Sequence, residues 1–213
     1  MIFDMDGVIF DTERLYLEVW QEIFKEYGYV LEKEDYLSCM GRGREKVKEI
    51  YISKFGVKLP IDEMYRLKDE RLDYRIENEA NLLKEGVIET LEYLKDNNYK
   101  VGLATSARRN RVKRDLSKFN IKKYFDYIIT GEEVKKGKPN PEIFLKAMEM
   151  LSENKENTLI IEDSKSGIEA AIKSGAKVLH IRDLIKLDNK EIKYVENLGE
   201  VIKYLSLSVK TIL

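Results

Sequence analysis

Two acidic residues directly follow a short apolar run at the start of the chain. Asp4 and Asp6 lie one residue apart in the sequence Ile-Phe-Asp-Met-Asp-Gly. The apolar run is typical of a buried strand in a parallel sheet, where charge is costly unless a metal ion or hydrogen bonds stabilise it. Asp4 and Asp6 can therefore share a hard divalent cation, with Asp4 placed as a nucleophile and Asp6 as an acid or base. Gly7 lets the backbone turn sharply and present N–H groups to an anion.

The same spacing has two other interpretations. An EF-hand calcium loop also begins Asp-x-Asp, but it needs further oxygen ligands and a glycine at its sixth position. Residues 8–10 are Val, Ile and Phe, so a calcium loop is excluded. An acidic turn without chemistry remains the alternative for this motif taken alone.

A second acidic pair and a pair of hydroxyls follow later apolar runs. Glu162 and Asp163 come after Leu-Ile-Ile, and Thr105 and Ser106 come after Val-Gly-Leu-Ala. Two acidic pairs at one edge of a sheet would repel each other unless a cation lies between them, and an all-oxygen ligand set favours Mg²⁺ shared with a substrate phosphate. The hydroxyls suit an anion held at the start of a helix, although an ordinary helix cap is the alternative.

Lys138 lies in a loop that its neighbours make rigid. Pro139 and Pro141 flank Asn140 and fix the backbone just after the lysine. A rigid loop is an unusual setting for a lysine that is merely solvated, so we expect Lys138 to neutralise phosphate and carboxylates. A basic surface loop is the alternative for this segment taken alone.

Two kinds of sequence pattern must position these residues. After Asp11, apolar residues recur at helical spacing and no strand pattern occurs for about seventy residues. Helical and strand patterns then alternate, which indicates a parallel sheet with helices on both faces. We predict a Rossmann-like doubly wound α/β core, residues 1–11 and 82–213, with an inserted all-helical domain, residues 12–81. The predicted helices cover residues 12–27, 33–39, 47–55, 60–76, 87–95, 109–119, 141–151 and 166–174, and the predicted strands that follow the first cover 100–105, 127–130, 158–161 and 177–181.

The composition removes several classes of function. The 213 residues include 38 basic and 39 acidic side chains, so no overall charge favours nucleic acid or an anionic membrane as partner. The only cysteine, Cys39, excludes an intramolecular disulfide, and the only histidine, His180, lies in an apolar run where a core position is expected. No apolar run reaches the roughly 20 residues of a membrane helix and no signal peptide is recognisable, so we expect a cytoplasmic protein.

Taken together and in this order, the motifs closely resemble those of the haloacid dehalogenase (HAD) superfamily, in its phosphatase and beta-phosphoglucomutase-like branch. The resemblance covers nearly the whole chain, and the predicted helical insert is similar to the cap domain of that branch. The motifs that carry it are residues 3–13 (Phe-Asp-Met-Asp-Gly-Val-Ile-Phe-Asp-Thr-Glu), 104–106 (Ala-Thr-Ser), 138–141 (Lys-Pro-Asn-Pro), 161–164 (Ile-Glu-Asp-Ser) and 167–171 (Gly-Ile-Glu-Ala-Ala).

This resemblance implies phosphoryl transfer through an aspartyl phosphate. Asp4 would attack phosphorus, and Asp6 would protonate the leaving alcohol and later take a proton from water. Thr105, the Ser106 backbone and Lys138 would hold the transferring group and offset its charge. Closure of the cap would exclude bulk water.

The resemblance also implies the ligands of a metal ion and of the substrate. Mg²⁺ would be bound by the Asp4 carboxylate, the Asp6 backbone carbonyl and Asp163, with Glu162 as a direct or water-mediated ligand. The residues expected to bind substrate are Gly7, Ser106, Ala107, Arg44 and Arg108.

The cap should decide between hydrolysis and isomerisation. Tyr16 stands where beta-phosphoglucomutase carries a histidine, and the cap lysine of that enzyme is replaced near Glu70. Gly41 and Arg44 do match the cap loop in which the mutase binds the distal phosphate. We therefore expect a phosphatase that hydrolyses a small phosphate monoester, with a beta-phosphoglucomutase-like phosphosugar mutase as the alternative.

Other classes and partners receive less support. A signalling receiver module uses similar residues, but it is about half this length and lacks the helical insert. The basic side chains of residues 108–114 are expected to form a solvated helix face, with Arg108 near the phosphate site. Arg71 can face an anionic substrate or solvent. We expect a small phosphorylated metabolite as the partner, no nucleic acid or membrane, and a monomer or weak homodimer.

Overall fold

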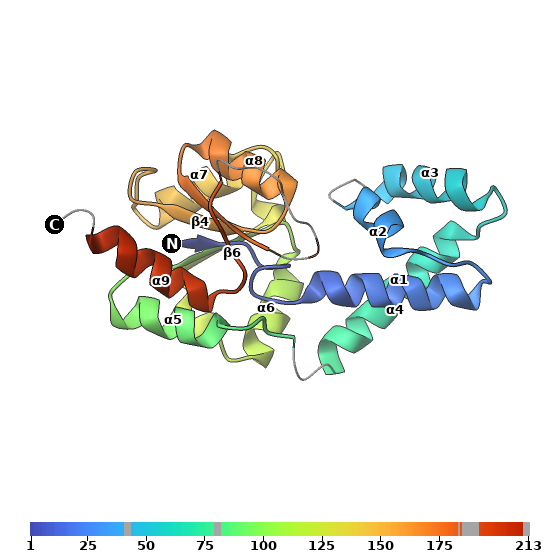
Figure 1. Ribbon diagram of the computed structural model, residues 1–213, viewed down its shortest axis with the longest axis horizontal. Coiled ribbons are helices and arrows are strands. Elements are labelled where there is room, and N and C mark those ends of the chain that lie inside the picture. The colour runs from blue at the N-terminus through green and yellow to red at the C-terminus, as the bar shows by residue number, and fades with distance from the viewer. Residues whose placement is uncertain (41–43, 79–81, 183, 185–191, 211–213) are drawn as a thin grey trace. The chain divides into compact units, whose positions relative to one another are not determined.

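Six short parallel strands form one sheet in the part of the chain that the structure describes (Figure 1). The computed structural model describes residues 1–40, 44–78, 82–182, 184 and 192–210. The strands lie in the order β3-β2-β1-β4-β5-β6. They are β1 (Ile2–Phe3), β2 (Gly102–Thr105), β3 (Tyr127–Thr130), β4 (Leu159–Glu162), β5 (Lys177–Ile181) and β6 (Tyr194–Val195).

Strand β1 has only two residues, but it lies at the centre of the sheet. Ile2 is opposite Gly102 on one side and Ile160 on the other. The winding of the chain reverses beside β1, and ligands of doubly wound sheets bind at the carboxyl ends of the strands next to such a reversal. Asp4, after β1, and Glu162, at the end of β4, lie at this edge.

Helices cover both faces of the sheet, with α7 and α8 on one face and α5 and α9 on the other (Figure 1). The apolar faces of α7 and α8 pack on β2 to β5 around a buried core that includes Ile2, Ile129, Phe144 and Ile160. The helices of this unit are α5 (Val87–Asp96), α6 (Arg109–Lys118), α7 (Glu142–Met150), α8 (Lys165–Ser174) and α9 (Gly199–Lys210), with the short 3₁₀ helices η1 (Lys122–Tyr124) and η2 (Gly131–Glu133).

A second unit consists of helices only, within the described residues. The chain separates into two compact units, one formed by Met1–Asp11 with Leu83–Leu213 and the other by Thr12–Leu82. In the helical unit, Trp20 and Phe24 pack edge-on against Tyr51 and form its aromatic core. Its helices are α1 (Thr12–Glu26), α2 (Lys33–Cys39), α3 (Arg44–Phe55) and α4 (Ile61–Asn78).

All the predicted helices and strands form, and their ends differ from the prediction by at most three residues. The strand predicted from residue 100 begins at Gly102, because the N–H of Val101 donates to the Asp126 carboxylate at 2.7 Å. Strand β6 and helix α9 were not predicted. A two-residue strand is too short for a periodic pattern, whereas the apolar spacing of α9 was present and overlooked. No helix among the described residues has the length and apolarity to cross a membrane.

Candidate active site

The segment after β1 is a tight turn built around Gly7. Gly7 has a φ of 74°, a left-handed conformation that favours glycine, and its N–H donates to the carbonyl of Phe10 at 2.8 Å. The N–H of Asp4 donates to the carbonyl of Ile161 on β4 at 3.0 Å. The backbone of Asp4 is therefore fixed by the sheet, and the turn directs the chain away from the strand ends immediately afterwards.

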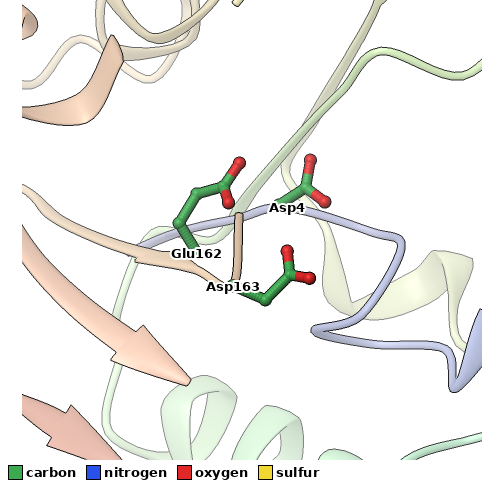
Figure 2. A group of neighbouring side chains, drawn as sticks. All are labelled: Asp4, Glu162 and Asp163. Carbon is green, nitrogen blue, oxygen red and sulfur yellow. The ribbon is translucent and has the colours of Figure 1, made fainter. Parts of the chain in front are cut away.

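Three carboxylates converge where β1 and β4 end (Figure 2). Asp4, Glu162 and Asp163 each offer an oxygen, and these oxygens lie within 4.8 Å of one another. All three side chains are buried. Carboxylate oxygens at this spacing form the ligand set of a hard cation such as Mg²⁺.

Lys138 supplies positive charge to this cluster. Its Nζ lies 2.5 Å from Asp4 Oδ1, 2.6 Å from Glu162 Oε1 and 3.3 Å from the carbonyl oxygen of Ala104. Its side chain is 6% exposed and its ammonium also lies 4.9 Å from the ring centroid of Phe144. One ammonium beside three carboxylates leaves a local excess of negative charge, which fits the residues to a divalent cation.

The pKa values of Asp4 and Lys138 are both raised, but for opposite reasons. Burial raises the pKa of Asp4 to about 7, with Lys138 lowering it and Glu162 raising it. Burial alone would lower the pKa of Lys138, but attraction to Asp4 and Glu162 outweighs burial and raises it above its ordinary value. Lys138 is therefore a permanent cation, whereas Asp4 depends on nearby positive charge to remain ionised.

Glu162 is held on several sides. Its Oε2 accepts the backbone N–H of Ser164 at 2.9 Å and the Ser164 hydroxyl at 3.0 Å. Ser164 caps α8, because its Oγ accepts the N–H of Gly167 at 3.0 Å. A Cβ at Gly167 would lie 1.7 Å from Glu162 Oε1, so a side chain there would displace the Glu162 carboxylate from the position in which Lys138 and Ser164 hold it.

The hydroxyls predicted to bind phosphate lie at the end of β2. Thr105 is buried, and its Oγ1 accepts the N–H of Ala107 at 3.1 Å, which forms a small polar turn. Ser106 is exposed, and Arg108 is exposed at the position that precedes α6. This turn is compatible with anion binding, and the binding roles of Ser106, Ala107 and Arg108 remain predictions.

The side chain of Asp6 pairs with Arg111, a residue for which the sequence predicts no role in the site. Both oxygens of Asp6 accept hydrogen bonds from the guanidinium of Arg111, with Nη1 to Oδ2 at 3.1 Å. The expectation that residues 108–114 form a solvated face was wrong for Arg111, whose side chain is 19% exposed. The spacing of Arg111 and Asp115, which are four residues apart and also paired, was the available signal.

Three cations of the helical unit, those of Arg44, Lys48 and Lys68, lie near the ring of Tyr65. The Arg44 guanidinium lies 4.3 Å from the Tyr65 ring centroid and donates to Asp69 at 2.6 Å. A pocket of about 290 Å³ is lined by Arg44, Lys48, Asp62, Tyr65, Arg66 and Asp69.

Two other positions of the helical unit that the sequence analysis considered, Arg71 and Tyr16, have contacts within the unit. Arg71 donates to both oxygens of Glu26, at 2.7 and 2.6 Å, so its guanidinium is already paired. The Nζ of Lys68 lies 5.4 Å from the ring centroid of Tyr16. Gly41 lies outside the described residues.

Comparison with known proteins assigns the chain to a class. The sequence model of the haloacid dehalogenase-like hydrolase family matches residues 1–181. The chain belongs to this family and is an enzyme of the HAD superfamily.

Individual relatives are phosphatases and mutase-like structures. The chain is 35% identical over 182 residues to a phosphorylated carbohydrates phosphatase of Thermotoga maritima, covering 84% of this chain and 83% of the relative. It is 30% identical to a putative pyrophosphatase PpaX of Caldanaerobacter subterraneus subsp. tengcongensis, covering 96% and 93%. The crystal structure of a putative beta-phosphoglucomutase from Thermotoga maritima matches with a TM-score of 0.77 at 31% identity, covering 96% and 97%.

Proposed function

We propose that the protein is a Mg²⁺-dependent phosphatase that hydrolyses a small phosphorylated metabolite through an aspartyl phosphate. The observation that carries the proposal is the buried group of Asp4, Glu162 and Asp163 with Lys138 at the switch point of the sheet. Its relatives named as phosphatases, one of them of phosphorylated carbohydrates, support the substrate class.

In the proposed reaction, Asp4, Asp6, Lys138 and Thr105 each have a separate role. Asp4 Oδ attacks phosphorus, a bond to Asp4 forms and the bond to the leaving oxygen breaks. Asp6 gives a proton to that oxygen, then takes a proton from the water that attacks the aspartyl phosphate, which releases inorganic phosphate and restores Asp4. Lys138 and the Thr105 turn offset the charge of the transferring group.

The metal ion would be held by Asp4, Asp163 and the backbone carbonyl of Asp6, with Glu162 directly or through water. When bound, Mg²⁺ stabilises negative charge on the transferring phosphoryl group and keeps Asp4 ionised. Glu162 is already engaged by Lys138 and Ser164, which favours the role through water.

The helical unit is proposed to act as a cap that contributes substrate contacts. Arg44 and Lys48 line its pocket beside Tyr65 and suit an anionic group that replaces their carboxylate partners. A phosphosugar mutase is the second candidate, because the match to the putative beta-phosphoglucomutase covers almost the full length of both chains. Tyr16, in place of the mutase histidine, favours hydrolysis.

The test is phosphate release from a panel of sugar phosphates, other metabolite phosphates and pyrophosphate, with Mg²⁺ and with EDTA. We expect release that needs Mg²⁺ and that falls by at least about 10³-fold in Asp4→Asn, since the nucleophile is lost. Beta-glucose 1-phosphate with a trace of the bisphosphate is followed for glucose 6-phosphate.

The outcomes separate the two candidates. Isomerisation without phosphate release would make the enzyme a mutase. Full activity in EDTA, or in Asp4→Asn, would contradict the proposed mechanism.

A further inference from the structure

Arg111 holds the carboxylate of Asp6 with both arms of its guanidinium. Nη1 donates to Oδ2 at 3.1 Å and Nη2 donates to Oδ1. The two residues are 105 positions apart in the chain, and both belong to the α/β unit. A bidentate pair of this kind fixes the plane of a carboxylate as well as its position, which a single charged contact does not.

The guanidinium of Arg111 is also held by a hydrogen bond to Asp115. Asp115, one helical turn further along α6, is fully buried and accepts from Arg111 Nε at 3.3 Å. Arg114 Nε donates to the other oxygen of Asp115 at 2.9 Å. The order of contacts is therefore a buried acid, an arginine on the same helix and then Asp6 in the turn after β1. Each member is held by hydrogen bonds to the next.

We propose that Arg111 is a positioning residue that sets the orientation of the Asp6 carboxyl group for its two proton transfers. The bidentate pair holds the ionised form that takes a proton from water, whereas the protonated form keeps one contact with Arg111 and directs the O–H of its other oxygen to the leaving oxygen. The inference rests on the proposed function, in which Asp6 gives a proton to the leaving oxygen and later takes one from water. The carboxylate stands in a turn, beyond the last paired residue of β1, so the sheet does not fix its side-chain rotamer. The bidentate contact from Arg111 on α6 supplies that constraint. Helix α6 begins just after the Thr105 turn, so the Asp6 contact and the Thr105 turn are both positioned by this helix.

A purely structural ion pair is the competing explanation, and a double-mutant cycle separates the two. Arg111→Met keeps the apolar stem and removes the bidentate contact. The probe is glucose 6-phosphate, whose leaving alcohol needs a proton, at saturating Mg²⁺. We expect kcat to fall about 10- to 100-fold, which is part of the rate enhancement that an acid–base residue contributes, with KM changed less than about threefold. In an Asp6→Asn background the same substitution should change kcat by less than about twofold, because the group on which it acts has already been replaced.

Two further variants complete the experiment. Arg109→Met is the matched control, since Arg109 lies on the same helix and pairs with Glu133 instead. We expect its kcat to be unchanged. Arg111→Lys retains a charge beside Asp6 and Asp115 without the bidentate contact, and should recover only part of the lost kcat. If Arg111→Met does not fold, as thermal unfolding would show, Arg111→Lys carries the same comparison.

The result that overturns the inference is no loss of kcat from the Arg111 substitution, or an equal loss in the native and the Asp6→Asn backgrounds. Wild type and Asp4→Asn are assayed in parallel. Absence of turnover by the wild type, or activity in Asp4→Asn, would mean that the proposed function fails, and the inference then falls with it. Turnover that depends on Asp4 but not on Arg111 would overturn the inference alone.

Discussion

At the scale of single residues, the site is a group of buried ionisable side chains. Asp4 is 7% exposed and lies beside Glu162, Asp163 and the ammonium of Lys138. Burial favours the neutral form of a carboxyl group, and nearby positive charge favours the ionised form. Asp4, the proposed nucleophile, should therefore be ionised at neutral pH only when positive charge is placed next to it, as by a bound metal ion.

This balance predicts how stability depends on pH in the absence of metal. The pKa of Asp4 is about 7 in the folded protein against 3.8 in the reference state. Between these values the folded chain retains a proton that the unfolded chain has lost, so the free energy of unfolding should fall as pH rises. From pH 5 to 7 the contribution of Asp4 is at most about 3 kcal/mol.

Urea unfolding of wild type and Asp4→Asn in EDTA at pH 5 and pH 7 checks this prediction. The wild type should lose more stability over that interval than Asp4→Asn, which has no titrating group at this position. Saturating Mg²⁺ should reduce the difference. Identical pH dependence of the two proteins would show that the environment of Asp4 does not raise its pKa.

At the scale of elements, short strands and helix starts place the reactive groups. Strand β1 has only two residues, but both pair with strands on each side, so the position of Asp4 is set by β2 and β4. The first turn of α8 comes so close to β4 that the side chain of Glu162 occupies the space beside Gly167. The orientation of this carboxylate therefore depends on the absence of a side chain at Gly167.

Gly167→Ala tests this close packing. Alanine favours a helix over glycine by up to about 1 kcal/mol, but its methyl group would overlap a carboxylate that Lys138 and Ser164 hold in place. Overpacking of this kind costs about 1–3 kcal/mol, so we expect net destabilisation and loss of at least about 10-fold in kcat/KM.

The control is Gly137→Ala, because no atom lies within 4 Å of a Cβ at Gly137. Thermal unfolding and phosphate release are measured for both variants. A Gly167→Ala protein as stable and as active as the control would show that the Glu162 carboxylate can move without cost.

At the scale of the whole molecule, charge is balanced overall and unbalanced locally. The chain has a net charge of −1. At the switch point of the sheet, however, the described residues bring the buried carboxylates of Asp4, Glu162 and Asp163 together with the ammonium of Lys138. The topology produces this excess, because β1 and β4 are far apart in the chain and lie side by side in the sheet.

Binding of a cation at this point should stabilise the entire α/β unit. At a Mg²⁺ concentration 100 times its Kd, the gain in free energy of unfolding is about 2.7 kcal/mol, or a rise in Tm of about 5 °C or more. Asp163→Asn should abolish most of the rise, since it removes a proposed metal ligand.

Differential scanning calorimetry with Mg²⁺ and with EDTA measures the effect. Asp96→Asn serves as the control, because Asp96 is an exposed acidic residue at the end of α5. An equal rise in Tm for Asp163→Asn and wild type would place the cation elsewhere on the protein.

The sequence alone determined the residue types of the site and the succession of elements. Asp4, Thr105, Lys138 and the Glu162–Asp163 pair were predicted because acidic, hydroxyl and basic residues at strand ends are local signals. The alternation of helix and strand patterns likewise depends on side chains near one another in the chain. The family resemblance drew on the same short, ordered motifs.

Only the tertiary structure decided which of these groups touch and how they are held. The contacts of Lys138 with both Asp4 and Glu162 depend on distances between segments that the sequence does not specify. Arg111 was overlooked for the same reason, since an arginine on a helix resembles any solvated basic residue until the turn after β1 brings Asp6 to it. Contacts between distant segments are set by the packing of the sheet and its helices, which no local pattern records.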